Sequence, residues 1–392
     1  MNSLRIVFHK YHKIIIPILF IGLMTSCSPT NSRAESETVS NQTENKKSIK
    51  LALLLDTSNS MDGLIDQAKS QLWKIVNELA EAKADGVAPT VEIALYEYGN
   101  DGLSALSGYV RQVAPMTDDL DLISEKLFSL RTNGGSEYCG KVIKTSLEDL
   151  DWNDPEKENL KMIFIAGNEP FSQGPVNFRT ACGLAKEKDV IINTIFCGNF
   201  DQGINISWKD GATLTDGEYM SIEQDKKTVY IETPYDQKID QLNTQLNNTY
   251  IYYGDQGYSK KQSQITQDNN AASYGTSNKV DRIVSKSKHV YKNESWDLVE
   301  ASEQDERIIE EAEVSTLPSE MQSMTTEERK IYVKQKQAER EKIKGEITEL
   351  SKLRSKHIVE NTSEEDKEGR LDNVMIEAIK EKAKTKNFEF DN

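Results

Sequence analysis

The chain has 392 residues, of which 37% are hydrophobic and 29% are charged, and its formal net charge is −16 at pH 7. Such an excess of carboxylates argues against nucleic acid or an anionic lipid surface as the partner, and it favours solubility and cation binding. The length allows about two domains after a short leader and a tether.

The first 27 residues have the pattern of an export signal. A basic start precedes an apolar stretch over residues 14–24, and Cys27 follows after small residues. The stretch is shorter than the roughly 20 residues that span a bilayer, and Pro17 interrupts it. We therefore expect a lipoprotein signal peptide over residues 1–26 and lipidation of Cys27, with acyl chains that anchor the protein in a membrane. The alternative is ordinary secretion.

Residues 27–47 are polar, lack aromatic side chains and show no hydrophobic period. Such a segment buries too little apolar surface to fold, so we expect a disordered tether. Ser28, rather than an aspartate, follows the cysteine, which favours the outer membrane where the usual lipoprotein sorting rule applies. The sequence therefore predicts a lipid-anchored protein of a bacterial cell envelope.

Residues 48–254 alternate apolar runs with amphipathic stretches. This pattern predicts an α/β fold, with a doubly wound, mostly parallel sheet that helices cover on both faces. Continuous apolar runs indicate central strands, and the shorter run that begins at Tyr109 indicates an edge strand. The expected strands lie at 51–55, 91–98, 109–116, 162–166 and 190–196.

A loop rich in acidic and hydroxyl groups follows the first expected strand. Asp56 stands at the carboxyl end of that strand, with Ser58 and Ser60 at alternate positions before an amphipathic stretch. Ligands of open α/β sheets bind outside the carboxyl ends of the strands, and hard oxygen donors of this kind suit Mg²⁺ or Mn²⁺. The alternative is structural, with a serine capping the helix and Asp56 accepting backbone hydrogen bonds.

This loop resembles the metal-ion-dependent adhesion site of von Willebrand factor A (vWA) domains, and Asp56, Ser58 and Ser60 match its first motif residue by residue. The resemblance implies a vWA fold over residues 48–254, a divalent cation, and a partner protein that offers an acidic residue. The second motif of the family is a threonine in a glycine-rich loop. Ser136 falls on that position after two glycines and keeps the hydroxyl.

The third motif departs from the family pattern. The family has an aspartate after this strand, where this chain has Gly167, followed by Asn168 and Glu169. Glu169 is the candidate to reach the metal, directly or through water. Because a missing carboxylate reduces the attraction for a doubly charged ion, we expect weak, millimolar affinity or an empty site. The amino-acid sequence of residues 166–171, with other segments up to residue 298, also resembles that of bacterial vWA-domain lipoproteins with a C-terminal helical region. This resemblance implies no known activity.

Three cysteines follow Cys27, namely Cys139, Cys182 and Cys197. An oxidising envelope would allow one disulfide and one free thiol, and the sequence does not choose the pair. A zinc site is disfavoured because no Cys-x-x-Cys spacing occurs and both later histidines lie far away.

Composition divides the remainder of the chain into a polar linker over residues 255–290 and a mainly helical region over residues 291–392. Thr325 and Glu328 form a capping-box pattern that starts a long charged helix at about 325–357. Its narrow apolar stripe is expected to pair with the later helix around residues 371–379, with self-association through another copy as the alternative. The stripe consists of Ile343, Ile347, Leu350 and Leu353.

Three functions are compatible with these patterns. The favoured one is an envelope-anchored protein-interaction module that binds an envelope or extracellular partner through a divalent metal. The alternative is a metal-independent scaffold that assembles through its C-terminal helices. A hydrolase is the weakest, because the sequence has neither a Gly-x-Ser-x-Gly nor a His-Glu-x-x-His pattern, and Ser58 lacks a nearby base. We therefore expect that the protein is not an enzyme.

Overall fold

The computed structural model describes residues 47–152, 159–223, 225–226, 230–363 and 370–390. The expected signal peptide, Cys27 and all of the expected tether except Lys47 lie outside the described residues, so these remain predictions. Residues 45–392 cluster as one compact unit. In the described part of the chain, no helix combines the length and the apolar character needed to cross a membrane.

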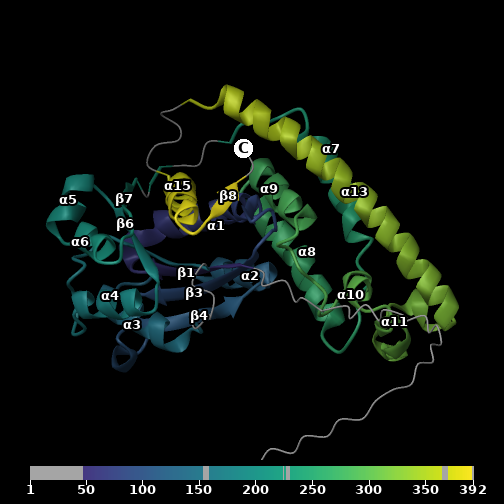
Figure 1. Cartoon of the computed structure of the whole chain (residues 1–392), viewed down its shortest axis with the longest axis horizontal. Coiled ribbons are helices and arrows are strands. Elements are labelled where there is room, and N and C mark those ends of the chain that lie inside the picture. The colour runs from purple at the N-terminus through teal and green to yellow at the C-terminus, as the bar shows by residue number, and fades with distance from the viewer. Residues whose placement is uncertain (1–46, 153–158, 224, 227–229, 364–369, 391–392) are drawn as a thin grey trace, which may run out of the picture. The chain divides into compact units, whose positions relative to one another are not determined.

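A six-stranded sheet in the order β4-β3-β1-β5-β6-β7 forms the centre of this unit (Figure 1). Every neighbouring pair is parallel except β3 with β4, which confirms the expected α/β class with a mostly parallel sheet. β4, expected as an edge strand, lies at the edge and runs antiparallel to β3. The chain runs outward from β1 to β4 and then returns to β5, so the order reverses between β1 and β5, where ligands of such sheets bind. The strands are β1 (Ser48–Asp56), β3 (Thr90–Tyr98), β4 (Val110–Thr117), β5 (Leu160–Gly167), β6 (Ile191–Cys197) and β7 (Tyr219–Ile222).

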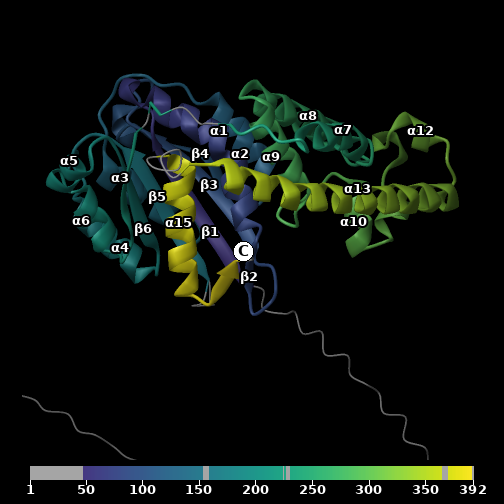
Figure 2. The ribbon, with the colours of Figure 1, turned by 90° about the horizontal axis from the view of Figure 1, so that it is seen from above.

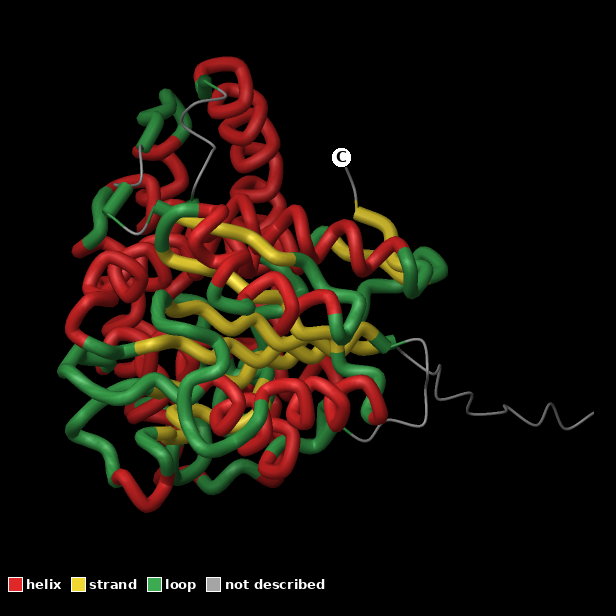
Figure 3. The backbone as a smooth tube through the Cα atoms, turned by 90° about the vertical axis from the view of Figure 1, so that its left-hand side faces the viewer, coloured by secondary structure: helices red, strands yellow, loops and turns green. Residues whose placement is uncertain are grey.

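Helices cover both faces of the sheet, so the strands form a layer between them (Figure 3). Side chains alternate along β1: Leu53 and Leu55 enter one core with α1 (Asp62–Leu79), whereas Leu54 enters a second core with α3 (Cys139–Asp149). This alternation follows from the two-residue period of a strand. Further helices of the α/β part are α2 (Leu120–Ser129), α4 (Phe178–Glu187), α5 (Phe200–Asn205) and α6 (Trp208–Thr213).

The helix beside α1 comes from the far end of the chain. α15 (Leu371–Lys384) packs on α1, β5 and β7 (Figure 2), and β8 (Phe388–Phe390) then pairs with β2 (Ala82–Ala84) in an antiparallel ribbon. The expected continuous domain over residues 48–254 is therefore wrong in one respect. Its helical layer is completed by residues that follow the whole helical region, because Leu371 and its apolar neighbours on α15 bury their side chains against α1.

Residues 255–290, expected as a linker, instead form α8 (Gly257–Ser273) and α9 (Thr276–Ser287), which pack on each other and on the α/β part. The linker prediction failed because it counted apolar residues only. Gln264 and Gln267 are buried, and their side chains bond to Tyr291 and Ser124 respectively. Polar side chains with fixed hydrogen-bond partners can therefore build a buried interface.

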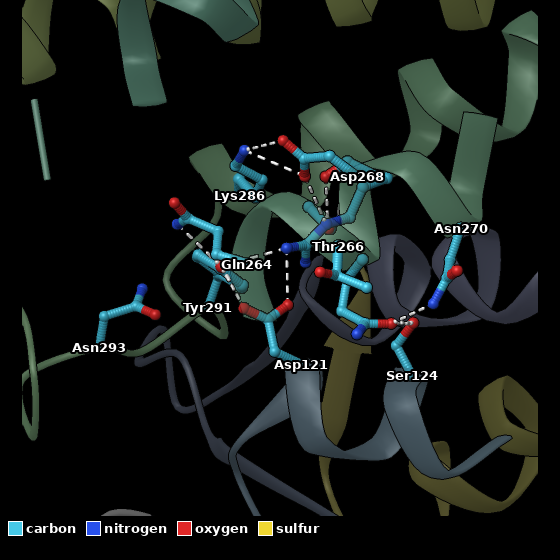
Figure 4. Close-up of polar contacts among 12 residues, drawn as sticks. Asp121, Ser124, Gln264, Thr266, Asp268, Asn270, Lys286, Tyr291 and Asn293 are labelled. Carbon is cyan, nitrogen blue, oxygen red and sulfur yellow. Dashed lines mark hydrogen bonds and ion pairs between the residues drawn. The ribbon is translucent and has the colours of Figure 1, made fainter. Parts of the chain in front are cut away.

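A network of buried charges joins α2 to α8 and α9 (Figure 4). The fully buried Arg282 pairs with Asp121 at 2.6 Å and with Asp268 at 3.1 Å, and Lys286 pairs with Asp268 at 2.8 Å. The Tyr291 hydroxyl donates to Asp121 at 2.7 Å. Two cations thus face two carboxylates, and Asp268 keeps a pKa below its usual range beside Lys286 and Arg282.

α13 (Thr326–Asn361) begins at the expected capping box, in which Thr325 and Glu328 bond to each other's backbone N–H groups. It packs on α7 (Asp236–Asn247), α9, α10 (Leu298–Gln304) and α11 (Ile308–Glu311), whereas α15 packs on α1. The expected pairing with the 371–379 helix is therefore wrong. Ile343 and Ile347 join the core of this same chain, and a coiled coil is not shown.

Two arginines of α13 form buried ion pairs with other parts of the chain, where apolar pairing with the 371–379 helix was expected. Arg340 donates to Asp297 at 2.5 Å and lies over the ring of Tyr250 at 4.2 Å. Arg354 donates to Asp236 at 2.9 Å and to Asp281 at 2.7 Å. The remaining short helix of this region is α12 (Ser319–Gln322).

Glu300 on α10 is expected to make stability fall as pH rises. Burial raises the pKa of Glu300 from 4.5 to about 7, so the folded state holds its proton more tightly than the unfolded state does. The destabilisation therefore develops between those two values and is complete above the folded pKa. We expect Glu300→Gln to stabilise the protein by about 3 kcal/mol at about pH 8 and by almost nothing at about pH 4. Urea unfolding at both pH values measures this, and equal effects at both would contradict it.

Candidate functional site

Asp56 ends β1 at the point where the strand order reverses. The side chain is fully buried, and its Oδ1 accepts a hydrogen bond from the Ser58 N–H at 2.7 Å. Its Oδ2 is also buried, with no hydrogen-bond partner among the described residues. One carboxylate oxygen thus shapes the turn, and the other is left for a ligand.

The two serines of the first motif lie together. The Ser58 and Ser60 hydroxyls are 3.2 Å apart, and the Asn168 Nδ2 donates to the Ser60 Oγ at 3.1 Å from the loop after β5. Neither the short helix at Asn59–Met61 nor α1 has a side-chain cap, so these hydroxyls do not serve as helix caps. The structural alternative therefore holds only for Asp56 Oδ1, which accepts the backbone N–H of Ser58.

The loop between α2 and α3 brings Glu137, rather than only Ser136, to this edge. Ser136 is half-buried, whereas Glu137 is 5% exposed and its Oε2 has no hydrogen-bond partner in the described part of the chain. A Cβ added to Gly99 would lie 2.7 Å from Asp56 Oδ1 and 2.8 Å from Glu137 Cγ. Gly99 has a φ of +78°, so a glycine there permits both the turn and this close approach. The sequence reasoning missed Glu137, although it directly follows Ser136.

Glu169 forms its hydrogen bond at this edge of the sheet through its backbone carbonyl and not through its carboxylate. The side chain is exposed, and the Glu169 carbonyl accepts a hydrogen bond from Trp208 Nε1 at 2.8 Å. Burial raises the pKa of Glu137, the charge of the Glu169 carboxylate raises it further, and the Glu169 backbone N–H opposes this rise. The expected metal-ligating role of the Glu169 side chain is therefore untested, and the geometry places Glu137 nearer to Asp56.

Burial dominates the electrostatics of this edge. It raises the pKa of Asp56 well above 3.8, and the charge of Glu137 raises it further. Burial also raises the pKa of Glu137. Among the described residues, no ion pair joins either carboxylate to a lysine or arginine. Two adjacent buried carboxylates need either a shared proton or a cation, because like charges at this separation destabilise each other.

The donor set fits a hard divalent cation. Asp56 Oδ2, Glu137 Oε2 and Asn168 Oδ1 are buried acceptors without partners among the described atoms, and two serine hydroxyls lie beside them. Mg²⁺ and Mn²⁺ prefer such oxygen ligands and retain waters. In the described residues no three His, Cys, Asp or Glu side chains gather as a metal cluster, so a cation here depends on two carboxylates and the hydroxyls.

The three later cysteines are buried free thiols, so neither the disulfide nor the zinc alternative is seen in the described residues. Burial raises the pKa of Cys182 to about 12 and the pKa of Cys197 well above 9.0. Thiols with such raised pKa values are poor nucleophiles and metal ligands. The cysteines therefore act as small apolar core residues.

Comparisons with known proteins find similarity to solved structures alone. No family model matches the sequence, and no curated protein matches it. Similar solved structures include BatB from Bacteroides thetaiotaomicron, with 14% identity over 44% of this chain and 90% of that chain (TM-score 0.34). The SpRpn10 VWA domain has 17% identity over 44% and 87% of the two chains (TM-score 0.33). An aerotolerance-related membrane protein from Bacteroides fragilis has 12% identity over 45% and 93% (TM-score 0.32).

The chain has a vWA-like fold, as the order and direction of its strands indicate. The sequence predicts a doubly wound, mostly parallel sheet with an edge strand at residues 109–116, and both are confirmed. The strand order and the antiparallel direction of β4 are findings of the structure. The similar structures carry no information on a ligand or partner of this chain.

Proposed function

We propose that this protein is an interaction module of a bacterial cell envelope that uses a divalent cation, Mg²⁺ or Mn²⁺, at the carboxyl edge of its sheet. Asp56, Ser58, Ser60 and Ser136 are the expected ligands from the sequence, and Glu137 joins them. When bound, the cation supplies a Lewis-acidic centre that an acidic residue of a partner protein can approach. The protein itself supplies binding and orientation and carries out no reaction.

The observation that carries this proposal is the pair of buried carboxylate oxygens, Asp56 Oδ2 and Glu137 Oε2, which have no hydrogen-bond partner among the described residues. An uncompensated buried charge costs several kcal/mol of stability. Two carboxyl groups side by side at a strand end are compensated either by a shared proton or by a bound cation, and the proposal assigns the cation. Structural capping does not account for them, since the serines cap neither helix.

Manganese binding by the full chain tests the proposal. Free Mn²⁺ is counted by electron paramagnetic resonance during titration, and Mg²⁺ is then added as a competitor. We expect about one competable ion per chain with a dissociation constant between about 10 μM and 1 mM. The proposal would be abandoned if no Mn²⁺ were bound at about 10 mM, or if Mg²⁺ left the bound Mn²⁺ in place.

The metal-independent scaffold gains no support from the helices. Its assembly needs a free apolar stripe on α13, but Ile343 and Ile347 are buried within this chain. Ile331, Leu353 and Val359 of α13 are exposed, but among these three only Leu353 belongs to the apolar stripe. Self-association through the C-terminal helices therefore stays a weaker prediction than a cation-dependent partner.

A further inference from the structure

The place of the missing third-motif carboxylate is already filled. A Cβ on Gly167 would lie 2.5 Å from the Tyr98 hydroxyl and 3.1 Å from Asp56 Oδ2. The Tyr98 hydroxyl is held there because it donates to the Ala166 carbonyl at 2.9 Å. An aspartate at position 167 would therefore displace Tyr98, and the chain needs its second carboxylate from elsewhere.

Glu137 is held in a fixed position that faces Asp56. Its N–H donates to Gln173 Oε1 at 2.6 Å. The side chains of Asp56 and Ser58 and the backbone of Glu169 lie close enough to its carboxyl group to shift its pKa. The backbone before it is packed as tightly, because a Cβ on Gly135 would overlap the Gly99 carbonyl. Glu137 Oε2 remains buried and without a partner among the described atoms. This arrangement directs a carboxylate toward Asp56 in the absence of any counter-charge.

We propose that Glu137 is an internal ligand of the cation that replaces the carboxylate missing at Gly167 and competes with the acidic residue of a partner. This inference rests on the proposed function, because it requires that the cation binds. Asp56 and Glu137 together balance the charge of a divalent ion. A third carboxylate, from a partner, is then attracted weakly, so the partner's acidic residue must displace Glu137.

The inference predicts two effects of opposite sign for Glu137→Gln. The affinity for Mn²⁺ should fall about tenfold, because one of two carboxylates is lost. The affinity of the bound ion for a small external carboxylate should rise about tenfold, because the competitor is gone and the centre carries a net positive charge. Replacement of a residue with a merely structural role would lower the Mn²⁺ affinity without raising the affinity of the bound ion for an external carboxylate.

The experiment uses the full chain with Mn²⁺ and acetate as the actual probes. Electron paramagnetic resonance gives the Mn²⁺ affinity. At saturating Mn²⁺, the longitudinal relaxation of water protons reports the waters on the ion, and acetate that replaces them reduces the relaxation. Asp101→Asn is the matched control, since it removes an exposed carboxylate on the neighbouring loop after β3 that is not among the proposed ligands. We expect Asp101→Asn to behave as wild type in both measurements.

Each outcome separates the inference from the proposed function. Absence of Mn²⁺ binding in wild type contradicts both. Binding in wild type with an unchanged Glu137→Gln variant, or with equal effects in Asp101→Asn, overturns the role of Glu137 alone. Glu137→Asp keeps the charge and should lose less Mn²⁺ affinity than Glu137→Gln. Unfolding in EDTA controls for folding, because removal of one of two adjacent buried charges should leave Glu137→Gln at least as stable as wild type.

Discussion

Asp56→Asn is expected to abolish divalent-cation binding while stabilising the cation-free protein. The amide keeps the shape of the side chain but removes the charge that attracts the ion, and it also relieves repulsion from Glu137. In EDTA the variant should therefore unfold at a higher temperature than wild type. Addition of Mg²⁺ at about ten times its dissociation constant should stabilise wild type by about 1.4 kcal/mol and the variant by nothing.

Thermal unfolding with EDTA or Mg²⁺ measures both effects on the full chain. Asp101→Asn is the control, since Asp101 is exposed on the neighbouring loop after β3 and carries the same charge. It should keep the Mg²⁺ stabilisation of wild type. An Asp56→Asn variant that still gains stability from Mg²⁺ would show that the ion binds elsewhere.

Arg282→Ala is expected to cause the largest loss of stability of any single change discussed, about 3–5 kcal/mol. The guanidinium is fully buried between the rings of Trp73, at 4.4 Å, and Tyr291, at 4.8 Å. Its removal leaves Asp121 and Asp268 with less positive charge to pair with. The loss arises from these uncompensated carboxylates and from the vacated space between the rings.

Urea unfolding measures this loss, and Arg307→Ala is the matched control. Arg307 pairs with Asp305 on the surface, with its side chain 77% exposed, so its removal should cost far less stability than the removal of Arg282. Similar losses in both variants would contradict the view that the buried network secures α8 and α9 to α2.

The sheet could be predicted because its central strands are continuous apolar runs. The run at 162–166 lies within β5 and the run at 190–196 within β6, to within a residue. The three-residue strands β2 and β8 were not predicted, because they are short and pair between residues 82–84 and residues 388–390, which are far apart in the sequence. The docking of α15 on α1 escaped for the same reason, because a stripe of apolar residues indicates that a helix is buried without indicating its partner.

The first half of the candidate site was also predictable. Asp56, Ser58 and Ser60 follow one strand, and the local turn brings them together. Glu137 was not predicted, because the resemblance directed attention to the hydroxyl of Ser136. Its importance depends on the close approach of two glycine-containing loops, and a sequence motif does not encode such a contact between distant segments. Position 167 is a glycine because the Tyr98 hydroxyl occupies the space that a Cβ there would need.

The most direct test of the central claim is anomalous X-ray diffraction from crystals of the protein grown or soaked with Mn²⁺. The account predicts one anomalous peak at the carboxyl edge of β1, bonded at about 2.2 Å to oxygens of Asp56 and Glu137, with a serine hydroxyl and waters completing the shell. A well-ordered structure at about 10 mM Mn²⁺ with no peak between Asp56 and Glu137 would contradict it.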